Sequence, residues 1–326
     1  MIQLSKDILR HCITASEEKI AQARLAFASN NEASKFLRMN RRSVDRAMAK
    51  ILNRAMEAGD SPNVGQPKIL ILDIETAPMA GYLWSLWKPA FNTTMIDSHT
   101  YILSWAAKWV DSDEVLFDAL CRNPDYKAGD ETDTRMLQGI WELLDEADYI
   151  VAHNGDKFDI KKLNTRFLLN SFTPPVPYKQ IDTLKICKRM FGFDSNKLDN
   201  LLKEMYGYGK DEVGGFDTWR GCMRGDMDSW DTLIEYNKAD VTKLERLYLD
   251  MRAWDKLHPS AATHGGSAGK RVCTVCGSEN VSATDRTYST GVSQFRVYTC
   301  GDCGSHMRDR ASMLTAEQRS NILVKV

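Results

Sequence analysis

The sequence predicts an α/β protein in which a mixed sheet flanked by helices lies between a small all-α module and a small β module. In the middle of the chain, strand patterns come first and alternating helix and strand patterns follow, an order typical of such a sheet. Residues 15–58 contain neither proline nor glycine, which favours helix. Two Cys-x-x-Cys-Gly motifs lie near the end of the chain. We therefore expect three domains joined by Gly- and Pro-containing linkers at about 59–68 and 259–269, the domains being residues 1–60, 67–254 and 270–326.

The composition is that of an ordinary globular protein and excludes a polycation. The 326 residues are 43% hydrophobic and 27% charged, and the formal net charge is -1. Any binding of nucleic acid must therefore come from local basic patches. No apolar run has the length of a signal-peptide core or a membrane span, so we expect a cytoplasmic protein without membrane association. Four of the eight cysteines are scattered, which fits a reducing compartment.

A short apolar strand that ends in two acids is the most informative stretch. Ile69–Leu72 is followed by Asp73 and Glu75. Because side chains alternate along a strand, these two acids point to the same face, where they repel each other. A divalent cation held by oxygen ligands, Mg²⁺ or Mn²⁺, would relieve this repulsion. On this stretch alone, a solvated strand end is an equally good interpretation.

Two further segments place acids where they can join this pair. A buried strand at 149–152 ends in a turn with His153 and Asn154, and Asp159 then stands in the first turn of a helix. We expect His153 and Asn154 to shape the turn. A later helix, about 229–254, presents Tyr236 and Asp240 four residues apart on one face.

Several aromatic residues follow the acidic strand: Tyr82, Trp84, Trp87 and Phe91. Such a cluster can stack on unpaired bases of a nucleic acid. More often it belongs to a hydrophobic core, and we expect most of it to be buried.

Taken together, Asp73, Glu75, Asp159 and Asp240 stand in an Asp-x-Glu strand, an Asn-x-x-x-Phe-Asp turn and a Tyr-x-x-x-Asp helix. This order resembles the DEDD-type 3′-5′ exonucleases, which have an RNase H-like fold, over about residues 68–254. Glu235 occupies the position where the histidine branch of that family has histidine, so the resemblance is to the tyrosine branch (DEDDy).

The resemblance implies a phosphodiester hydrolase that removes nucleotides one at a time from a single-stranded 3′ end of DNA. It implies two Mg²⁺ or Mn²⁺ ions, about 3.5–4 Å apart, held by the four acids, with Tyr236 orienting the attacking water. The size and layout suit replication, repair or recombination, as in a phage-encoded nuclease acting in the host cytoplasm. Two alternatives stay open: a non-catalytic DNA-binding regulator or adaptor that keeps the fold, and an RNA-trimming exoribonuclease.

The N-terminal segment resembles a helix-turn-helix between Asn31 and Ala55. Its second helix carries an excess of basic residues that could contact duplex DNA, namely Arg41, Arg42, Arg46 and Lys50. The alternative is a helical appendage with a solvated basic face.

The C-terminal segment resembles a zinc ribbon. Its two knuckles supply four cysteines, Cys273, Cys276, Cys300 and Cys303. Four thiolates complete a tetrahedron around one Zn²⁺, so the zinc is expected to be structural. The alternative is a pair of redox dithiols. Whether this module binds nucleic acid or a replication or repair protein stays open.

Overall fold

The computed structural model describes residues 6–27, 29–57, 66–85, 87, 92–110, 112–211, 213–264 and 270–325. The chain divides into two compact units, Lys68–Met251 and a second one made of Met1–Pro67 and Arg252–Val326. Most of the first predicted linker, the second half of the other (265–269) and Phe91 lie outside the described residues.

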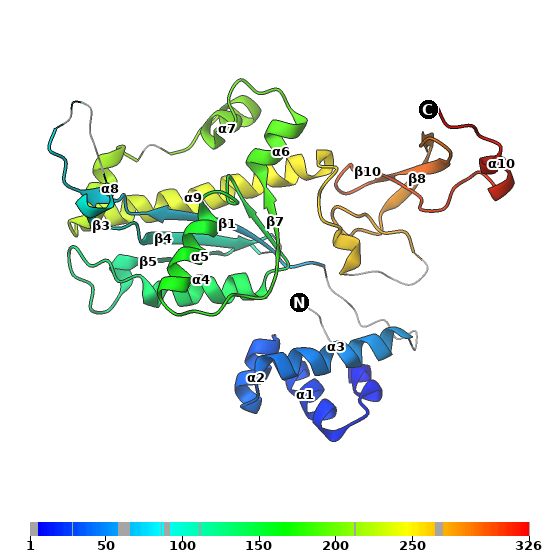
Figure 1. Ribbon diagram of the computed structural model, residues 1–326, viewed down its shortest axis with the longest axis horizontal. Coiled ribbons are helices and arrows are strands. Elements are labelled where there is room, and N and C mark those ends of the chain that lie inside the picture. Colours follow the sequence, from blue (N-terminus) through cyan, green and yellow to red (C-terminus); the bar gives the residue numbers. More distant parts are fainter. Residues whose placement is uncertain are drawn as a thin grey trace. The chain divides into compact units, whose positions relative to one another are not determined.

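A five-stranded mixed sheet forms the centre of the unit Lys68–Met251 (Figure 1). The strands are β1 (Ile69–Thr76), β4 (Ile102–Trp109), β5 (Val115–Ala119), β6 (Tyr149–Ala152) and β7 (Lys179–Asp182), in the order β5-β4-β1-β6-β7. β1 pairs antiparallel with β4 and parallel with β6, and β7 is parallel to β6. The predicted mixed sheet is confirmed, whereas β7 was not expected from the sequence.

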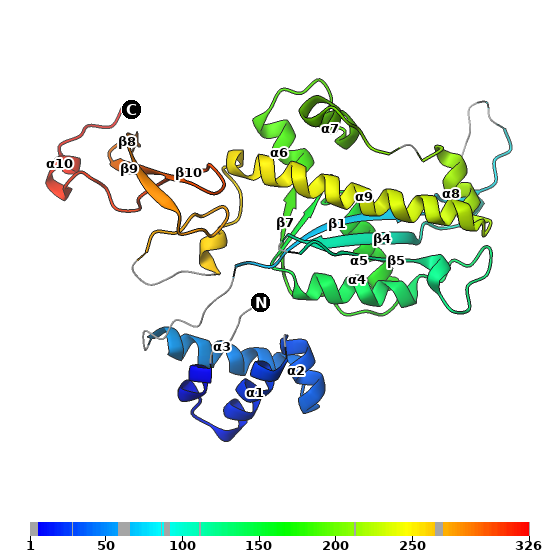
Figure 2. The same ribbon diagram turned by 180° about the vertical axis from the view of Figure 1, so that it is seen from behind.

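Helices cover both faces of the sheet, as Figure 2 shows from behind. α4 (Thr134–Glu146) and α5 (Asp159–Leu169) pack on one face. The other face is covered by α6 (Thr183–Met190), α7 (Leu198–Tyr206) and the long α9 (Met227–Met251). A short helix that the sequence did not reveal, α8 (Phe216–Met223), precedes α9.

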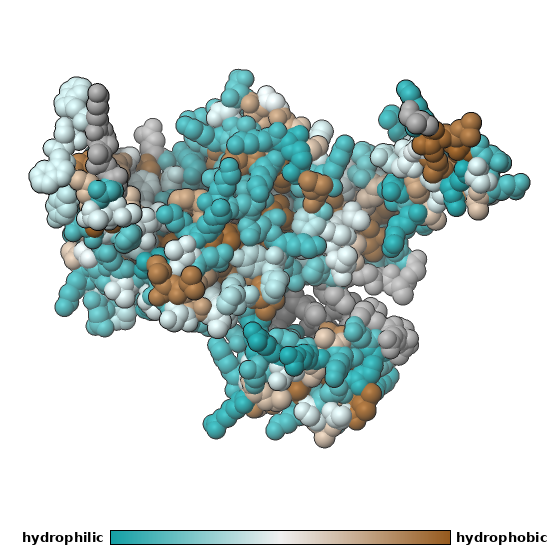
Figure 3. Space-filling view, viewed as in Figure 1, coloured by the Kyte–Doolittle hydropathy of each residue, from teal (hydrophilic) through white to brown (hydrophobic). Residues whose placement is uncertain are grey.

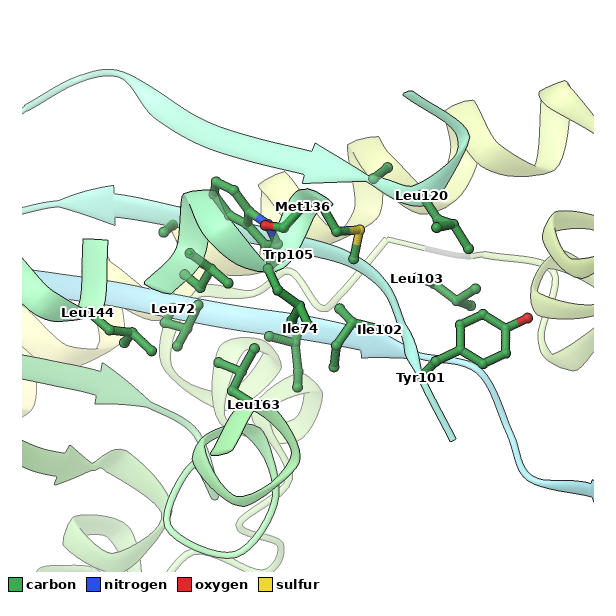
Figure 4. Packing of buried hydrophobic residues seen from close by; sticks show 14 of the residues in the cluster. Leu72, Ile74, Tyr101, Ile102, Leu103, Trp105, Leu120, Met136, Leu144 and Leu163 are labelled. Atoms are coloured by element: carbon green, nitrogen blue, oxygen red, sulfur yellow. The ribbon is translucent and has the colours of Figure 1, made fainter. Parts of the chain in front are cut away.

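The alternation of β1 decides where its two acids point. Leu70, Leu72 and Ile74 enter the core shared with α4 and α5, and Figure 4 shows Leu72 and Ile74 among Trp105, Met136 and Leu163. Ile69 and Ile71 face the opposite core, to which α9 contributes Val241 and Leu244. Asp73 and Glu75 continue the row of Ile69 and Ile71, so they point toward the face that α9 covers.

The segment between β1 and β4 corrects one expectation. It contains β2 (Ala80–Gly81), a short 3₁₀ helix (Thr93–Met95) and β3 (Ile96–Ser98), which pairs with β2. The exposed fractions are 71% for Tyr82, 95% for Trp84 and 89% for Trp87. The expectation that these aromatics are core is therefore wrong.

The N-terminal helices form a small core of their own. A 3₁₀ helix (Lys6–His11) and α1 (Ala15–Ala26), α2 (Asn30–Leu37) and α3 (Arg41–Glu57) enclose Ile20, Val44, Met48 and Ile51, among others. Arg38 ends α2 in the left-handed conformation, with φ of 52°. This residue therefore makes the turn that a glycine makes in many helix-turn-helix motifs.

The C-terminal segment is a three-stranded sheet in the order β10-β9-β8. Its elements are β8 (Val281–Ser289), β9 (Gln294–Cys300), β10 (His306–Arg308) and a final short helix α10 (Ala316–Ser320). Two 3₁₀ turns, Arg252–Trp254 and Ala261–Thr263, precede it. Among the described residues, no helix has both the length and the apolar character that a membrane crossing requires.

Candidate active site and zinc centre

Three of the predicted acids meet at the carboxyl end of β1. Asp73 and Glu75 come from this strand and Asp240 comes from α9, and their carboxylate oxygens lie within 4.8 Å of one another. Asp240 is buried, and the other two are partly exposed. Strand alternation supplies the first two acids, and the helical repeat places Asp240 opposite them.

Asp159 reaches the same end of β1 from the start of α5. Its Oδ1 accepts a hydrogen bond of 3.3 Å from the backbone N–H of Ile74, between the two acids of β1. Asp159 lies outside the group defined by the 4.8 Å distance. The turn before α5 needs Gly155, because a Cβ there would lie 2.5 Å from the Cβ of Ala152.

Burial raises the pKa of all four carboxyls, and repulsion within the cluster adds to it for Asp73 and Glu75. For Asp73, burial is the larger cause, and the charges of Asp159, Glu75 and Asp240 add to it. Burial raises the pKa of Glu75 to about 8 and that of Asp159 to about 7. Burial also raises the pKa of Asp240, against the opposing effect of a nearby lysine. The cluster therefore binds protons, or another cation, more readily than exposed carboxylates do.

That lysine is Lys210, which the sequence did not single out. Its Nζ forms an ion pair with Asp240 and donates a hydrogen bond of 2.9 Å to the Tyr236 hydroxyl. Burial would lower the pKa of Lys210, but the charges of Asp240 and Asp73 outweigh burial and raise it. Lys210 therefore stays positively charged within the acidic cluster.

The loop that carries Lys210 is anchored to α7. The backbone N–H of Lys210 donates a hydrogen bond of 2.8 Å to Asp199 in the first turn of this helix. The preceding residue is Gly209, and a Cβ there would lie 2.3 Å from Asp199 Oδ1. A glycine before Lys210 thus allows the loop to approach the helix closely.

Asn237, which follows Tyr236 on α9, orients Asp73. Its Nδ2 donates a hydrogen bond of 2.7 Å to Asp73 Oδ2, and its Oδ1 accepts one of 3.0 Å from Ser104 Oγ on β4. Ser104 and Asn237 are both buried. This chain of two hydrogen bonds holds one oxygen of Asp73 in place, as outer residues do around metal ligands.

Trp219 of α8 contacts the cluster from another side. Its indole N–H donates a hydrogen bond to Glu75. Its ring meets that of Tyr236 edge to face, with 6.3 Å between the centroids. Burial and the charge of Asp240 raise the pKa of Tyr236 to about 12, so its hydroxyl keeps its proton at neutral pH.

The donor set fits divalent cations that prefer oxygen. Among the described residues, Lys210 is the cation in contact with the cluster, and its single positive charge against four carboxylates leaves negative charge to be neutralised. Asp240 Oδ1 is buried and has no hydrogen-bond partner among the described residues, although Oδ2 contacts Lys210. An all-oxygen site of this kind suits Mg²⁺ or Mn²⁺.

The four cysteines of the two knuckles also meet. All four sulfurs lie within 4.8 Å of one another, with 3.6 Å between Cys273 and Cys303 and 3.6 Å between Cys276 and Cys300. Four sulfurs at about 2.3 Å from one Zn²⁺ would lie about 3.8 Å apart, so the cluster fits this ion. His306 lies outside the cluster, where it contacts Thr299.

The predicted basic residues of α3 have different surroundings. Arg42, Arg46 and Lys50 are exposed at intervals of four residues along one side of the helix. Arg41 lies 3.7 Å from Asp45 in an ion pair along the same helix. The structure thus leaves a row of three basic side chains in contact with solvent.

Sequence reasoning missed Lys210, Asn237 and Trp219. For Asn237 a signal exists, since it occupies a position of the apolar stripe of α9 between Leu233 and Val241. A polar residue at such a position indicates a buried hydrogen bond. Lys210 and Trp219 stand in a loop and a short helix without a distinctive pattern.

Comparison with known proteins gives a family match within the central domain. The model of the RNase H superfamily matches residues 93–252, which include Asp159, Lys210, Tyr236 and Asp240 but not the strand with Asp73 and Glu75. Among solved structures, the family B DNA polymerase of the hyperthermophilic archaeon Pyrobaculum calidifontis is similar with a TM-score of 0.42 and 16% sequence identity. This similarity covers 60% of the present chain and 26% of the polymerase chain. No curated protein matches.

Proposed function

We propose, from the premise that residues 93–252 form a domain of the RNase H superfamily, that the chain is a metal-dependent 3′-5′ exonuclease of the DEDDy type acting on DNA. The supporting observation is the meeting of acids from three distant segments. Asp73, Glu75 and Asp240 share one cluster, and Asp159 touches the strand between the first two. Their raised pKa makes a purely structural role costly.

The chemistry divides between the acids and the groups around them. Two Mg²⁺ or Mn²⁺ ions would be held by Asp73, Glu75, Asp159 and Asp240, and when bound they supply Lewis acidity at the terminal phosphodiester. Tyr236 keeps its proton at neutral pH, so its hydroxyl orients a water and does not act as the base. Glu75, held by Trp219, can accept a hydrogen bond from the same water.

Lys210 contributes a fixed positive charge. Its ammonium group contacts both Tyr236 and Asp240. Negative charge on the phosphate grows as the water attacks, and a cation already in place stabilises that charge without reorganisation. Lys210 also restricts the position of the Tyr236 hydroxyl.

The test of this activity uses a 5′-labelled single-stranded DNA oligonucleotide and an RNA of matched sequence, with Mg²⁺ or Mn²⁺. We expect a ladder that shortens from the 3′ end of the DNA and is lost with EDTA. Asp73→Ala and Asp240→Asn should abolish this ladder. Asp231 is an exposed acid on α9, the helix that carries Asp240, and Asp231→Asn should leave the ladder unchanged. Cleavage of RNA alone would favour an RNA-trimming enzyme. Binding without cleavage of either strand would favour an adaptor.

The N-terminal helices are proposed to bind duplex DNA through Arg42, Arg46 and Lys50, which are exposed on α3. Removing one basic side chain that neutralises a phosphate should reduce the slope of log K against log salt by about 0.9. Replacing all three residues with alanine should therefore weaken duplex binding and reduce the slope by up to about 3. Lys19→Ala, at an exposed position on α1, is the matched control. An unchanged slope would leave these helices without a role in binding DNA.

The C-terminal segment is proposed to be a structural zinc ribbon, since its four thiolates leave no coordination position for a reactant. It would stabilise the fold of the segment that contacts nucleic acid or a replication or repair protein.

A further inference from the structure

An aromatic arm follows the strand that carries Asp73 and Glu75. We define it by its described residues between β2 and β3, namely 82–85, 87 and 92–95. Its base is held by the pairing of β2 with β3 and by a hydrogen bond of 3.0 Å from the Tyr82 N–H to the Met95 carbonyl. Its side chains nevertheless remain in solvent, with Trp84 and Trp87 almost completely exposed.

Two exposed tryptophans three residues apart are unusual on a surface that has no partner. Large aromatic side chains are normally buried or placed in an interface. The Trp87 N–H donates a hydrogen bond of 3.1 Å to Ser85 Oγ. The arm therefore presents two exposed indole rings above a base that is fixed by strand pairing, as a binding surface does.

The arm starts close to the acidic cluster. Only a few positions separate Glu75 from β2, and the backbone between them is fixed by a hydrogen bond of 2.9 Å from the Ala77 N–H to the Tyr101 carbonyl. β3 and α8 both lie at the end of the sheet toward which β1 runs (Figure 1). The surface over this end carries pale residues of intermediate hydropathy in Figure 3.

α8 offers a second aromatic surface beside the same acids. Its Trp219 holds Glu75, and its Phe216 is 55% exposed. The guanidinium of Arg220 lies 5.3 Å from the centre of the Phe216 ring. Arg220 also forms an ion pair of 2.7 Å with Asp217. A strand that approached Glu75 would therefore meet aromatic faces, which are suited to unpaired bases.

We propose that the aromatic arm stacks, through Trp84 and Trp87, on unpaired bases of the nucleic-acid strand whose end reaches the acidic cluster. The inference rests on the proposed function, because that function brings a single strand to this edge of the sheet. Stacking accepts any base, since every base has a flat π surface. An exonuclease that moves along its substrate needs this tolerance, whereas a hydrogen-bonding pocket would stop at particular sequences.

The test separates contacts to bases from contacts to phosphates. Binding is measured by fluorescence anisotropy, without Mg²⁺ or Mn²⁺, for a 5′-fluorescein oligothymidylate and for an abasic strand of equal length. Each stacked base contributes about 1–3 kcal/mol. The double variant Trp84→Ala/Trp87→Ala should therefore bind the oligothymidylate at least tenfold more weakly than the unmodified protein. Its affinity for the abasic strand should equal that of the unmodified protein. Trp84→Phe/Trp87→Phe should retain most of the affinity, and Trp254→Ala, at another exposed tryptophan, should change neither.

Three results would overturn the proposal. The alanine variant could keep its affinity for both strands, as expected if the arm serves a protein partner or a lipid surface. It could lose affinity for both strands equally, which would indicate a phosphate contact or a change of fold. The phenylalanine variant could behave like the alanine variant, which would exclude stacking.

Failure of the arm and failure of the exonuclease are distinguishable. The binding assay contains no hydrolysis, and the cleavage assay with Asp73→Ala depends on no residue of the arm. If Trp84→Ala/Trp87→Ala loses the base-dependent affinity and the unmodified protein cleaves neither DNA nor RNA, the stacking role of the arm is supported and the exonuclease activity is refuted. If the protein cleaves DNA and Trp84→Ala/Trp87→Ala keeps the base-dependent affinity, the exonuclease is supported and the role of the arm is refuted.

Discussion

Lys210 forms an ion pair with Asp240, thirty residues further along the chain. The same ammonium group donates a hydrogen bond to Tyr236, one helical turn before Asp240 on α9. A residue from a loop thus contacts both residues of the Tyr-x-x-x-Asp motif. The electrostatic balance of the acidic cluster depends on this loop as well as on the sequence motifs.

Replacing Lys210 should impair the chemical step. Lys210→Gln removes the positive charge from beside Tyr236 and Asp240, and removal of one preorganised electrostatic interaction costs about 10²–10³ in kcat. We expect a decrease of this order, measured by single-turnover cleavage of a labelled oligonucleotide. Lys238→Gln, which removes an ion pair with the exposed Glu235 on the same helix, should leave kcat within about twofold. A Lys210→Gln enzyme as fast as that control would show that the ion pair has no catalytic effect.

Asn237→Leu should weaken the binding of divalent ions. Leucine has a similar size but cannot donate a hydrogen bond to Asp73, and removal of such an orienting hydrogen bond costs about 10–100-fold in metal affinity. The measurement is the dependence of the cleavage rate on Mn²⁺ concentration. Ser104→Ala, which removes only the hydrogen bond to Asn237, should have a smaller effect in the same direction. Equal Mn²⁺ dependence of all three proteins would refute the positioning role of Asn237.

Without divalent ions, the central domain should lose stability as the pH rises. Folding raises the pKa of Glu75 from 4.5 to about 8 and that of Asp159 from 3.8 to about 7. Such a carboxyl binds more protons in the folded chain, so the free energy of unfolding falls between the two pKa values. A difference of one in pKa corresponds to about 1.4 kcal/mol, and the total loss should be of the order of several kcal/mol between about pH 4 and 8.

This pH dependence can be checked by denaturant unfolding of zinc-loaded protein. Glu75→Gln should flatten the decline, and Mn²⁺ should restore stability at pH 8 by neutralising the carboxylates. Asp231→Asn should leave the decline unchanged because this acid is exposed. Stability that rises with pH over the same range would contradict the raised pKa values.

The cysteine cluster should hold one zinc ion per chain. Cys300→Ser removes one of the four thiolates and should release the metal, as measured by a colorimetric zinc assay after gel filtration. Cys12→Ser, in the N-terminal core, should retain it. Because a structural zinc stabilises its domain, the Cys300→Ser protein should also be cleaved more readily by protease around residues 270–310. A metal content unaffected by Cys300→Ser would place the zinc elsewhere.

The sequence was most informative where a local pattern repeats. The apolar run before Asp73 predicts a strand, and its period of two places Asp73 and Glu75 on one face, as observed. The helical repeat likewise puts Tyr236 and Asp240 on the side of α9 that meets Lys210. Asp182, directly before α6, likewise caps this helix and accepts hydrogen bonds from the backbone N–H groups of Leu184 and Lys185.

The sequence failed where burial depends on distant parts of the chain. Trp84 and Trp87 are residue types common in hydrophobic cores, but both lie in solvent. The sequence could not predict this exposure, because hydrophobicity does not reveal whether another element covers a side chain. β7 is short, and its exposed Lys179 and Gln180 hide the strand pattern. It forms because β6 offers an open edge for parallel pairing.

By itself, the sequence determined the mixed α/β class, the acidic strand, the turn before Asp159 and the two cysteine knuckles. Each of these features depends on a few neighbouring residues, whose spacing matches the period of a strand or a helix or the Cys-x-x-Cys spacing of a metal knuckle. Only the tertiary structure decided that Lys210, Asn237 and Trp219 surround the acids and that the aromatic arm stays in solvent. These relationships join residues that are tens of positions apart, and their geometry depends on how the helices pack on the sheet.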